Sequence, residues 1–264
     1  MIEILFGVYR VLFARKFFYK LNKLIYRMSL HGLGILNYKT DVQSGEDYFL
    51  RHELNRINDG VVLDVGANIG DYCSFLKRVN QTCNIYAFEP HPTTYRLLVE
   101  NTESLGIKTF NVGVGASEGS LVLYDYASND GSEHASLHKG VIEQIHKGLA
   151  IEHAVKVISL DRFILQQGLG KIALLKIDTE GHEFEVLKGA ENLLKTGRIE
   201  MIHLEFNAMN VVSRVFFKDI WDFLPNYDFY RMLPDGLVLI NDYSPVFCEI
   251  FAYQNIVAKL KVSK

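Results

Sequence analysis

Residues 61–70, VVLDVGANIG, decide the fold of this chain, because an apolar segment of strand length runs directly into two closely spaced glycines. Gly66 and Gly70 flank a polar turn and carry no side chain that would keep a ligand away from the backbone N–H groups. A helix that begins at Asp71 would direct its partly positive N-terminal end at a carboxylate or a phosphate. The stretch therefore predicts a strand, a turn and a helix that together hold a cofactor.

A second apolar strand ends in the segment NIYAFEP, residues 84–90, which places Glu89 at the strand end. A carboxylate at this position accepts hydrogen bonds from both hydroxyls of a ribose. The third glycine of the dinucleotide pattern G-x-G-x-x-G is missing, so a nucleoside with an amino-acid tail fits better than a dinucleotide. We expect Gly66, Asn68 and Gly70 to surround that tail. Asp64, beneath the turn, either binds the ammonium group of the tail or braces the turn.

The third motif is KIDTEGHE, residues 176–183, which follows an apolar strand and concentrates titratable side chains at the strand end. His182 ordinarily titrates near working pH and is a candidate proton acceptor, with Asp178 either orienting or replacing it. Glu180 is the third catalytic candidate. Successive residues point in different directions, so at least one acid is structural, and Glu183 has the position of a first-turn helix residue.

Together, DVGANIG (64–70), FEP (88–90) and KIDTEGHE (176–183) resemble the FkbM family of S-adenosylmethionine-dependent methyltransferases, and the resemblance extends over roughly residues 40–255. It implies an enzyme that transfers a methyl group from S-adenosylmethionine to a hydroxyl, often on a sugar of a surface polysaccharide or on a secondary metabolite. It also places Val112 and Gly113, after the third strand, beside the adenine. The implied cofactor-binding set is Asp64, Gly66, Asn68, Gly70, Glu89, Val112 and Gly113.

Apolar segments and helical patterns alternate along the chain, which predicts successive β-α units and a mostly parallel sheet. Strands are expected at 61–65, 84–88, 108–112, 172–177 and 201–206, and helices at 71–79, 93–105, 183–194 and 213–224. A turn at Pro234-Asp235-Gly236 and a final strand in CEIFAYQNIVA complete the pattern. The resemblance implies a Rossmann-like class I methyltransferase fold: a seven-stranded, mostly parallel sheet with helices on both faces, in one domain over residues 41–264.

A long polar insertion, residues 127–153, separates two further predicted strands, SLVLYDY and AVKVISL. Long irregular insertions in compact domains are usually functional, and we interpret this one as a lid that recognises the acceptor. The alternative is a solvated loop without chemistry. His134 and His138 have helical spacing, although histidines in such a loop are usually solvated. Ser136 and Leu137 resemble a pair found in this loop in the family, which suggests contact with the acceptor.

Composition limits the classes of partner. The chain has 264 residues, 48% of them hydrophobic, and a net charge of minus 3, which gives no overall field to attract nucleic acid. Three scattered cysteines indicate neither a disulfide framework nor a thiolate metal site, and they suit the cytoplasm. Glu205 and Asn207, near the 176–183 motif, leave a divalent cation as an option, but the spacing is not diagnostic and we assign no metal ligand.

The N-terminal segment is the one compositional anomaly, and it predicts a basic amphipathic helical extension over residues 1–40. In residues 1–28, Glu3 is the one acid, and six basic residues are interleaved with large apolar ones: Arg10, Arg15, Lys16, Lys20, Lys23 and Arg27. These charges exclude a membrane span. We expect the helix to pack on the catalytic domain or on a second subunit. The alternative is peripheral contact between residues 1–28 and the inner membrane surface.

Two other functions fit the same architecture. A nicotinamide-dependent oxidoreductase is disfavoured by the missing third glycine and by the lack of a Tyr-x-x-x-Lys relay near the cofactor motif. A non-catalytic nucleoside-binding module would keep the fold without turnover. We favour the methyltransferase, with a small-molecule or glycan acceptor as its partner.

Overall fold

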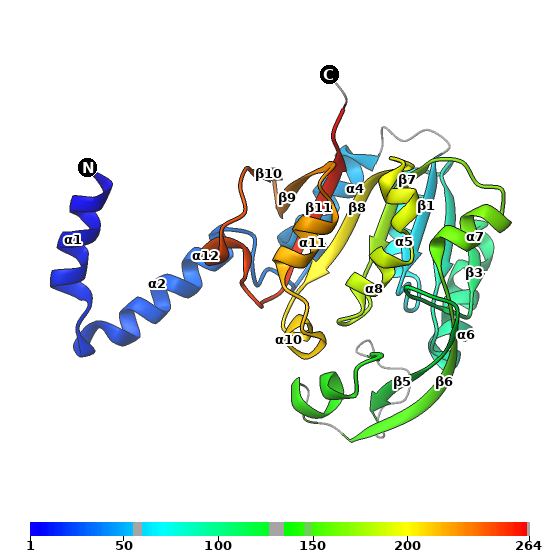
Figure 1. Ribbon diagram of the computed structural model, residues 1–264, viewed down its shortest axis with the longest axis horizontal. Helices are drawn as coiled ribbons and strands as arrows, with labels where there is room; N and C mark the ends of the chain where they lie inside the picture. Colours follow the sequence, from blue (N-terminus) through cyan, green and yellow to red (C-terminus); the bar gives the residue numbers. More distant parts are fainter. Residues whose placement is uncertain (55–59, 127–134, 146, 148, 263–264) are drawn as a thin grey trace.

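The computed structural model describes residues 1–54, 60–126, 135–145, 147 and 149–262. Its main sheet has the strand order β10-β9-β11-β8-β7-β1-β2-β3 (Figure 1). The strand bounds in this order are Gly236–Ile240, Tyr227–Leu233, Gln254–Leu260, Ile199–Phe206, Ile172–Ile177, Val61–Val65, Asn84–Phe88 and Lys108–Phe110.

The strands β8, β7, β1, β2 and β3 pair in parallel, and β11 runs antiparallel to both β8 and β9. The predicted α/β fold with a mostly parallel sheet and an antiparallel final strand is confirmed. The sheet has one strand more than the seven predicted, because β10 folds back on β9 as an antiparallel hairpin at the edge.

Alternation along the strands explains why helices cover both faces. Val62, Ile85 and Leu174 face one side and pack with α4 (Glu46–His52), α5 (Asp71–Val79) and α6 (Pro92–Thr102). The next residue of each strand faces the other side, where the helices are α7 (Leu160–Gln166), α8 (Glu183–Lys188), α9 (Glu191–Lys195) and α11 (Phe217–Phe223). The short helices α3 (Asp41–Ser44), α10 (Met209–Ser213) and α12 (Pro245–Cys248) lie in connections.

Helix α5 has the predicted bounds, but two other predicted helices are wrong in extent. The helix expected over 183–194 is divided into α8 and α9, because the Asp161 carboxylate accepts the N–H groups of Asn192 and Leu193 and so caps a new helix. The helix expected over 213–224 begins at Phe217, since Arg214 has the left-handed φ of 59° that ends α10.

A second, three-stranded sheet carries the predicted insertion. The two strands predicted around the insertion are β5 (Gly119–Tyr126) and β6 (Ala150–Ile158), which pair antiparallel, and β4 (Gly113–Val114) joins β6 in parallel. In the described part of the insertion, Ser136 exchanges two backbone hydrogen bonds with Tyr124. His134 lies outside the described residues.

Residues 2–32 are helical, as predicted, but they form two helices that extend away from the sheet (Figure 1). A break at Ala14 and the 3-10 turn η1 (Lys16–Phe18) separate α1 (Ile2–Phe13) from α2 (Tyr19–Gly32). No residue of α1 is buried, and Leu30 is the one buried residue of α2. The expected packing of this segment on the catalytic domain is therefore wrong for α1. None of the described helices is long and apolar enough to cross a bilayer.

Candidate active site

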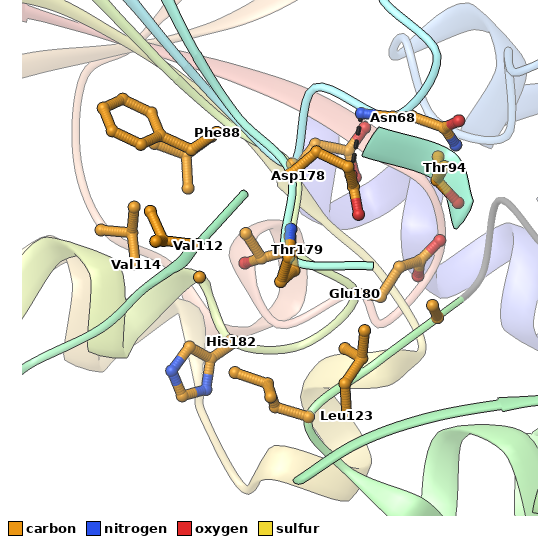
Figure 2. Close-up of a pocket in the computed structure, with 17 residues that line it drawn as sticks. Asn68, Phe88, Thr94, Val112, Val114, Leu123, Asp178, Thr179, Glu180 and His182 are labelled. Carbon is orange, nitrogen blue, oxygen red and sulfur yellow. Dashed lines mark hydrogen bonds between the residues drawn. The ribbon is translucent and has the colours of Figure 1, made fainter. Parts of the chain in front are cut away.

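Two cavities lie where β1, β2 and β7 end, and they share the wall formed by Gly66, Asn68 and Asp178. The first is also lined by Val65, Phe88, Glu89, Pro90, Thr94, Val112, Gly113, Val114, Leu123, Ala135, Leu137, Thr179, Glu180 and His182 (Figure 2). The second is also lined by Tyr38, Asp41, Glu46, Leu50, Ala67, Ile69, Asp71, Tyr72, Phe75, Arg78, Lys176, Glu205 and Tyr253. All three predicted catalytic residues and five of the seven predicted cofactor residues line the first cavity; Asp64 and Gly70 do not.

The two glycines of the turn after β1 allow other parts of the protein to pack closely against the backbone. Gly66 has a φ of +79°, and a Cβ there would lie 1.7 Å from the Asp178 carbonyl oxygen. Gly70 has a φ of +92°, and its Cβ would lie 2.7 Å from Cγ2 of Thr102 on α6. Gly70 therefore serves the packing of α5 against α6 and lies outside both cavities.

The backbone N–H groups of this turn are largely occupied within the protein. Gly66 and Ala67 both donate to the Phe88 carbonyl, and Gly70 donates to the Ala67 carbonyl. Asn68 donates to Glu89 at 3.0 Å. The predicted cradle of turn amides facing a ligand is therefore wrong for these four donors.

Glu89 fastens the β1 turn to the loop after β2. Its carboxylate accepts the N–H of Asn68 at 3.0 Å and that of His91 at 2.8 Å. Burial raises the pKa of Glu89 to about 7, although the two N–H donors act to lower it. The carboxylate lines the first cavity at the predicted strand end.

The first cavity has an apolar end and a polar end. Phe88, Val112 and Val114 gather at one side, while Asn68, Thr94 and Glu180 lie at the other (Figure 2). Val112 and Gly113 thus line the first cavity, and their contact with the adenine stays a prediction. Leu123 on β5 was not predicted, because its position depends on how the second sheet folds over the first.

A row of polar side chains crosses three parallel strands beneath the second cavity. Asp64, Lys176 and His203 are register neighbours on β1, β7 and β8. Asp64 is fully buried, accepts the thiol of Cys73 at 2.9 Å, and lies 3.7 Å from the Lys176 ammonium. Asp64 therefore braces α5 and β7 at the sheet end, and the turn amides that it was expected to brace donate to other acceptors.

Lys176 is the cation of this row. Its ammonium donates to Asp178 at 3.1 Å. Burial lowers the pKa of Lys176, but the carboxylates of Asp178, Asp64 and Glu46 raise it above its ordinary value. No role was predicted for Lys176 from the sequence. The signal was its position two residues before Asp178, which follows the same strand, because this spacing puts both side chains on the same side.

Glu46 on α4 and Tyr72 on α5 meet the row from the helix side. The Glu46 carboxylate lies 3.6 Å from His203, and the Tyr72 hydroxyl lies 3.2 Å from its Nδ1. Burial raises the pKa of Glu46 to about 7 and lowers the pKa of His203 to about 4. His203 is therefore neutral near pH 7.

His182 is not arranged as the expected base. Burial lowers its pKa to about 4, and among the described residues neither ring nitrogen has a hydrogen-bond partner. Asp178 therefore does not orient it, contrary to one of the two predicted arrangements. Of the two cavities, His182 lines only the first, whereas Asp178 lines both.

Two acids of the 176–183 motif differ in role. Glu183 accepts the N–H groups of Thr179 and Gly181, each at 3.0 Å, so it closes the loop after β7 and is structural, as predicted. Glu180 has a left-handed φ of 52°, and its carbonyl accepts the Ser136 hydroxyl at 2.6 Å. This bond ties the insertion to the loop, and Leu137 beside it lines the first cavity.

The divalent cation considered from the sequence has no set of ligands among the described residues. In the part of the chain that the structure describes, no group of three or more His, Cys, Asp or Glu side chains is placed to hold a metal ion. The acids considered for this role contact protein groups: Asn207 donates to Glu205, and Lys176 donates to Asp178.

The model of the methyltransferase FkbM domain family matches residues 64–230 of this chain. The chain belongs to the FkbM methyltransferase family. The match begins at Asp64 and includes the β1 turn, Glu89 and the 176–183 motif, so the family predicted from these residues is confirmed.

This FkbM methyltransferase is similar in sequence to curated methyltransferases of other organisms. Methyltransferase sdnD of Sordaria araneosa is 35% identical, covering 49% of this chain and 60% of that protein. Hexuronic acid methyltransferase AglP of Haloferax volcanii is 28% identical, covering 57% of each. The 2-O-methyltransferase NoeI of Sinorhizobium fredii is 24% identical, covering 68% and 76%. The chain spans about three fifths of the length of the first two.

Proposed function

We propose that this chain transfers the methyl group of S-adenosylmethionine to a hydroxyl of a neutral sugar or glycan precursor. One observation carries the proposal: the Asp178 carboxylate lies on the wall that the two cavities share. A group in this position can meet a donor from one side and an acceptor from the other.

The first cavity suits the nucleoside of the donor. Glu89 offers a carboxylate to the ribose hydroxyls, and Phe88, Val112 and Val114 offer apolar contact to the adenine (Figure 2). The amino-acid tail would extend past Gly66 toward the shared wall. When bound, the donor supplies an electrophilic methyl group on a sulfonium.

The second cavity suits an uncharged acceptor rich in hydroxyls. Five carboxyl groups line it, from Asp41, Glu46, Asp71, Asp178 and Glu205, together with the cations Arg78 and Lys176. Burial raises the pKa of Glu46 to about 7 and that of Glu205 well above its ordinary value, so the negative charge of the lining comes mainly from the three aspartates. Lys176 is already paired with Asp64 and Asp178. Carboxylates accept hydrogen bonds from sugar hydroxyls and repel an acidic sugar. The name of AglP, a hexuronic acid methyltransferase, supports a sugar acceptor, and that of NoeI, a 2-O-methyltransferase, supports transfer to a hydroxyl. The acidic lining favours a neutral sugar.

Asp178 takes the role of general base. Its carboxylate accepts the proton of the acceptor hydroxyl while that oxygen forms its bond to the methyl carbon, and the electron pair of the broken C–S bond returns to sulfur. Lys176 holds the carboxylate in place at 3.1 Å. The products are the methyl ether and S-adenosylhomocysteine.

The test is turnover of S-adenosylmethionine by the purified full chain with matched acceptors. Nucleotide-linked glucose and glucuronic acid differ by one carboxylate, so we expect O-methylation of the neutral sugar at least about tenfold faster than of the acid, a difference of about 1.4 kcal/mol. Proton NMR of the product identifies the new O-methyl group.

Two results would contradict the proposal. Calorimetric binding of NAD without binding of S-adenosylhomocysteine would favour the oxidoreductase. Binding of S-adenosylhomocysteine without turnover of any neutral hexose, hexuronic acid or lipid-linked glycan would favour the non-catalytic module.

Donor binding is expected to depend on pH through Glu89. Because burial raises the pKa of this carboxyl to about 7, it is mostly protonated at lower pH and ionised above. The ionised form accepts both ribose hydroxyls, so the Kd for S-adenosylhomocysteine should fall about tenfold from about pH 6 to about pH 8. Calorimetry at both pH values measures the change. Glu89→Gln is the matched control, and a pH dependence that persists in this variant would assign the effect to another group.

A further inference from the structure

We propose that α1, η1 and α2 form a docking surface for membranes of anionic phospholipid. The first observation is apolar exposure on a well-formed helix. In α1, seven large apolar side chains are each more than half exposed: Ile2, Ile4, Leu5, Phe6, Val8, Val11 and Leu12. Monomeric proteins rarely leave so continuous an apolar surface uncovered.

Helix α2 has the pattern of a helix that lies in a membrane interface. Leu21, Leu24, Ile25 and Met28 have helical spacing, share one face, and are all exposed. Lys20, Lys23 and Arg27 lie along the flank of that face. Apolar residues beside a basic row suit the boundary between acyl chains and anionic headgroups.

The N-terminal segment and the rest of the chain have net charges of opposite sign. Residues 1–28 contain six basic residues and one acidic residue, a net charge of plus 5, while the whole chain carries minus 3. Residues 29–264 therefore carry minus 8. A segment of opposite sign, at one end of the molecule, favours a polyanionic partner surface and disfavours pairing with the same basic segment of a second copy.

The junction between the helices has a defined shape. The Tyr9 hydroxyl donates to the Asn22 side chain at 2.7 Å, and Asn22 donates to the Phe13 carbonyl at 3.0 Å. The rings of Phe13 and Phe18 lie 5.1 Å apart. These contacts link α1 to α2 across the turn, so the two helices are held as one bent unit.

The outer side of this junction is a hollow that suits a phosphate headgroup. Arg15, Lys16 and Lys20 line it together with Phe17 and Tyr19. Phe17 is 87% exposed, which places an uncovered ring among three cations. At about 18 Å for 12 residues, α1 is too short to cross a hydrocarbon core of about 30 Å, so it would lie in the plane of the interface.

The experiment is co-sedimentation of the full chain with vesicles of phosphatidylcholine alone or mixed with phosphatidylglycerol. We expect binding to the mixed vesicles that weakens with added salt. The combined variant Lys16→Glu, Lys20→Glu, Lys23→Glu should lower the partition coefficient by about 100-fold or more, since each cation near such a surface contributes about fivefold.

The matched control reverses the same number of charges on exposed lysines of the globular part, with Lys171→Glu, Lys195→Glu and Lys218→Glu. It should bind as the parent does. A separate variant, Leu21→Ser with Leu24→Ser, keeps every charge and should also lose binding. The substituted residues of η1 and α2 do not pack on the domain, and the three control lysines are exposed on its surface. Circular dichroism and the Tm should therefore show an intact fold in each case.

Equal retention by neutral vesicles, or equal losses in the two charge-reversed variants, would overturn the proposal. So would a lipid-free dimer in sedimentation velocity that Leu21→Ser with Leu24→Ser dissociates, because the occupant would then be a second copy. The assay uses neither donor nor acceptor, so its outcome is independent of the proposed methyl transfer.

Discussion

Replacement of Asp178 by asparagine is expected to lower kcat about 10³-fold, while the Kd for S-adenosylhomocysteine stays within a few-fold of the parent value. Asparagine keeps the size of the side chain and still contacts the first cavity, but it cannot accept the proton of the acceptor hydroxyl. Lys176 retains Asp64 as a partner at 3.7 Å, so the local fold should persist. Steady-state kinetics with calorimetric binding measures both quantities.

His182→Gln is the matched control for this variant. The residue lines the first cavity beside the same loop, but it does not reach the second. Its replacement should reduce kcat less than tenfold, as expected for a group outside the proton transfer. Equal losses in the two variants, or a loss confined to His182→Gln, would move the role of base away from Asp178.

The second large effect is expected at Gly66. A methyl group there would lie 1.7 Å from the Asp178 carbonyl oxygen, which is backbone and cannot rotate away. Gly66→Ala must therefore separate the β1 turn from the loop after β7. We expect a loss of more than about 3 kcal/mol in the free energy of unfolding and no measurable binding of S-adenosylhomocysteine. Chemical denaturation and calorimetry measure the two effects.

Gly106→Ala isolates the backbone contribution. Gly106 has a similar left-handed φ of +66°, but a Cβ there would meet no atom within 4 Å. Its replacement should cost only about 1 to 2 kcal/mol for the conformation itself, with donor binding retained. If Gly66→Ala were as stable as this control, the two loops would not be in the tight contact described.

The β1 turn and the acid at the end of β2 were predictable because local patterns determine them. An apolar run, two glycines and a following helix define β1, its turn and α5, and Glu89 follows from its place at the end of β2. The role of Lys176 could not be predicted from local patterns, because its pairing with Asp64 depends on the register of two strands that are far apart in sequence.

The steric requirement for glycine at position 66 could not be predicted from the local sequence either. The atom that a side chain there would clash with is the carbonyl oxygen of Asp178, which is distant in sequence. Likewise, the division of α8 from α9 depends on a cap from distant Asp161. The periodicity of residues 1–28 predicted an amphipathic helix, but the same pattern describes a helix packed on protein and one left uncovered.

The family match covers residues 64–230, yet five residues of the second cavity lie outside it: Tyr38, Asp41, Glu46, Leu50 and Tyr253. The second cavity is therefore assembled partly from segments that flank the matched domain, whereas the first cavity is lined from within it. If the second cavity holds the acceptor, as proposed, mutations in these flanking segments would change its shape and charge while the loops of the first cavity stay fixed. We expect diversification of substrate preference, in evolution or in the laboratory, to be easiest at these five positions.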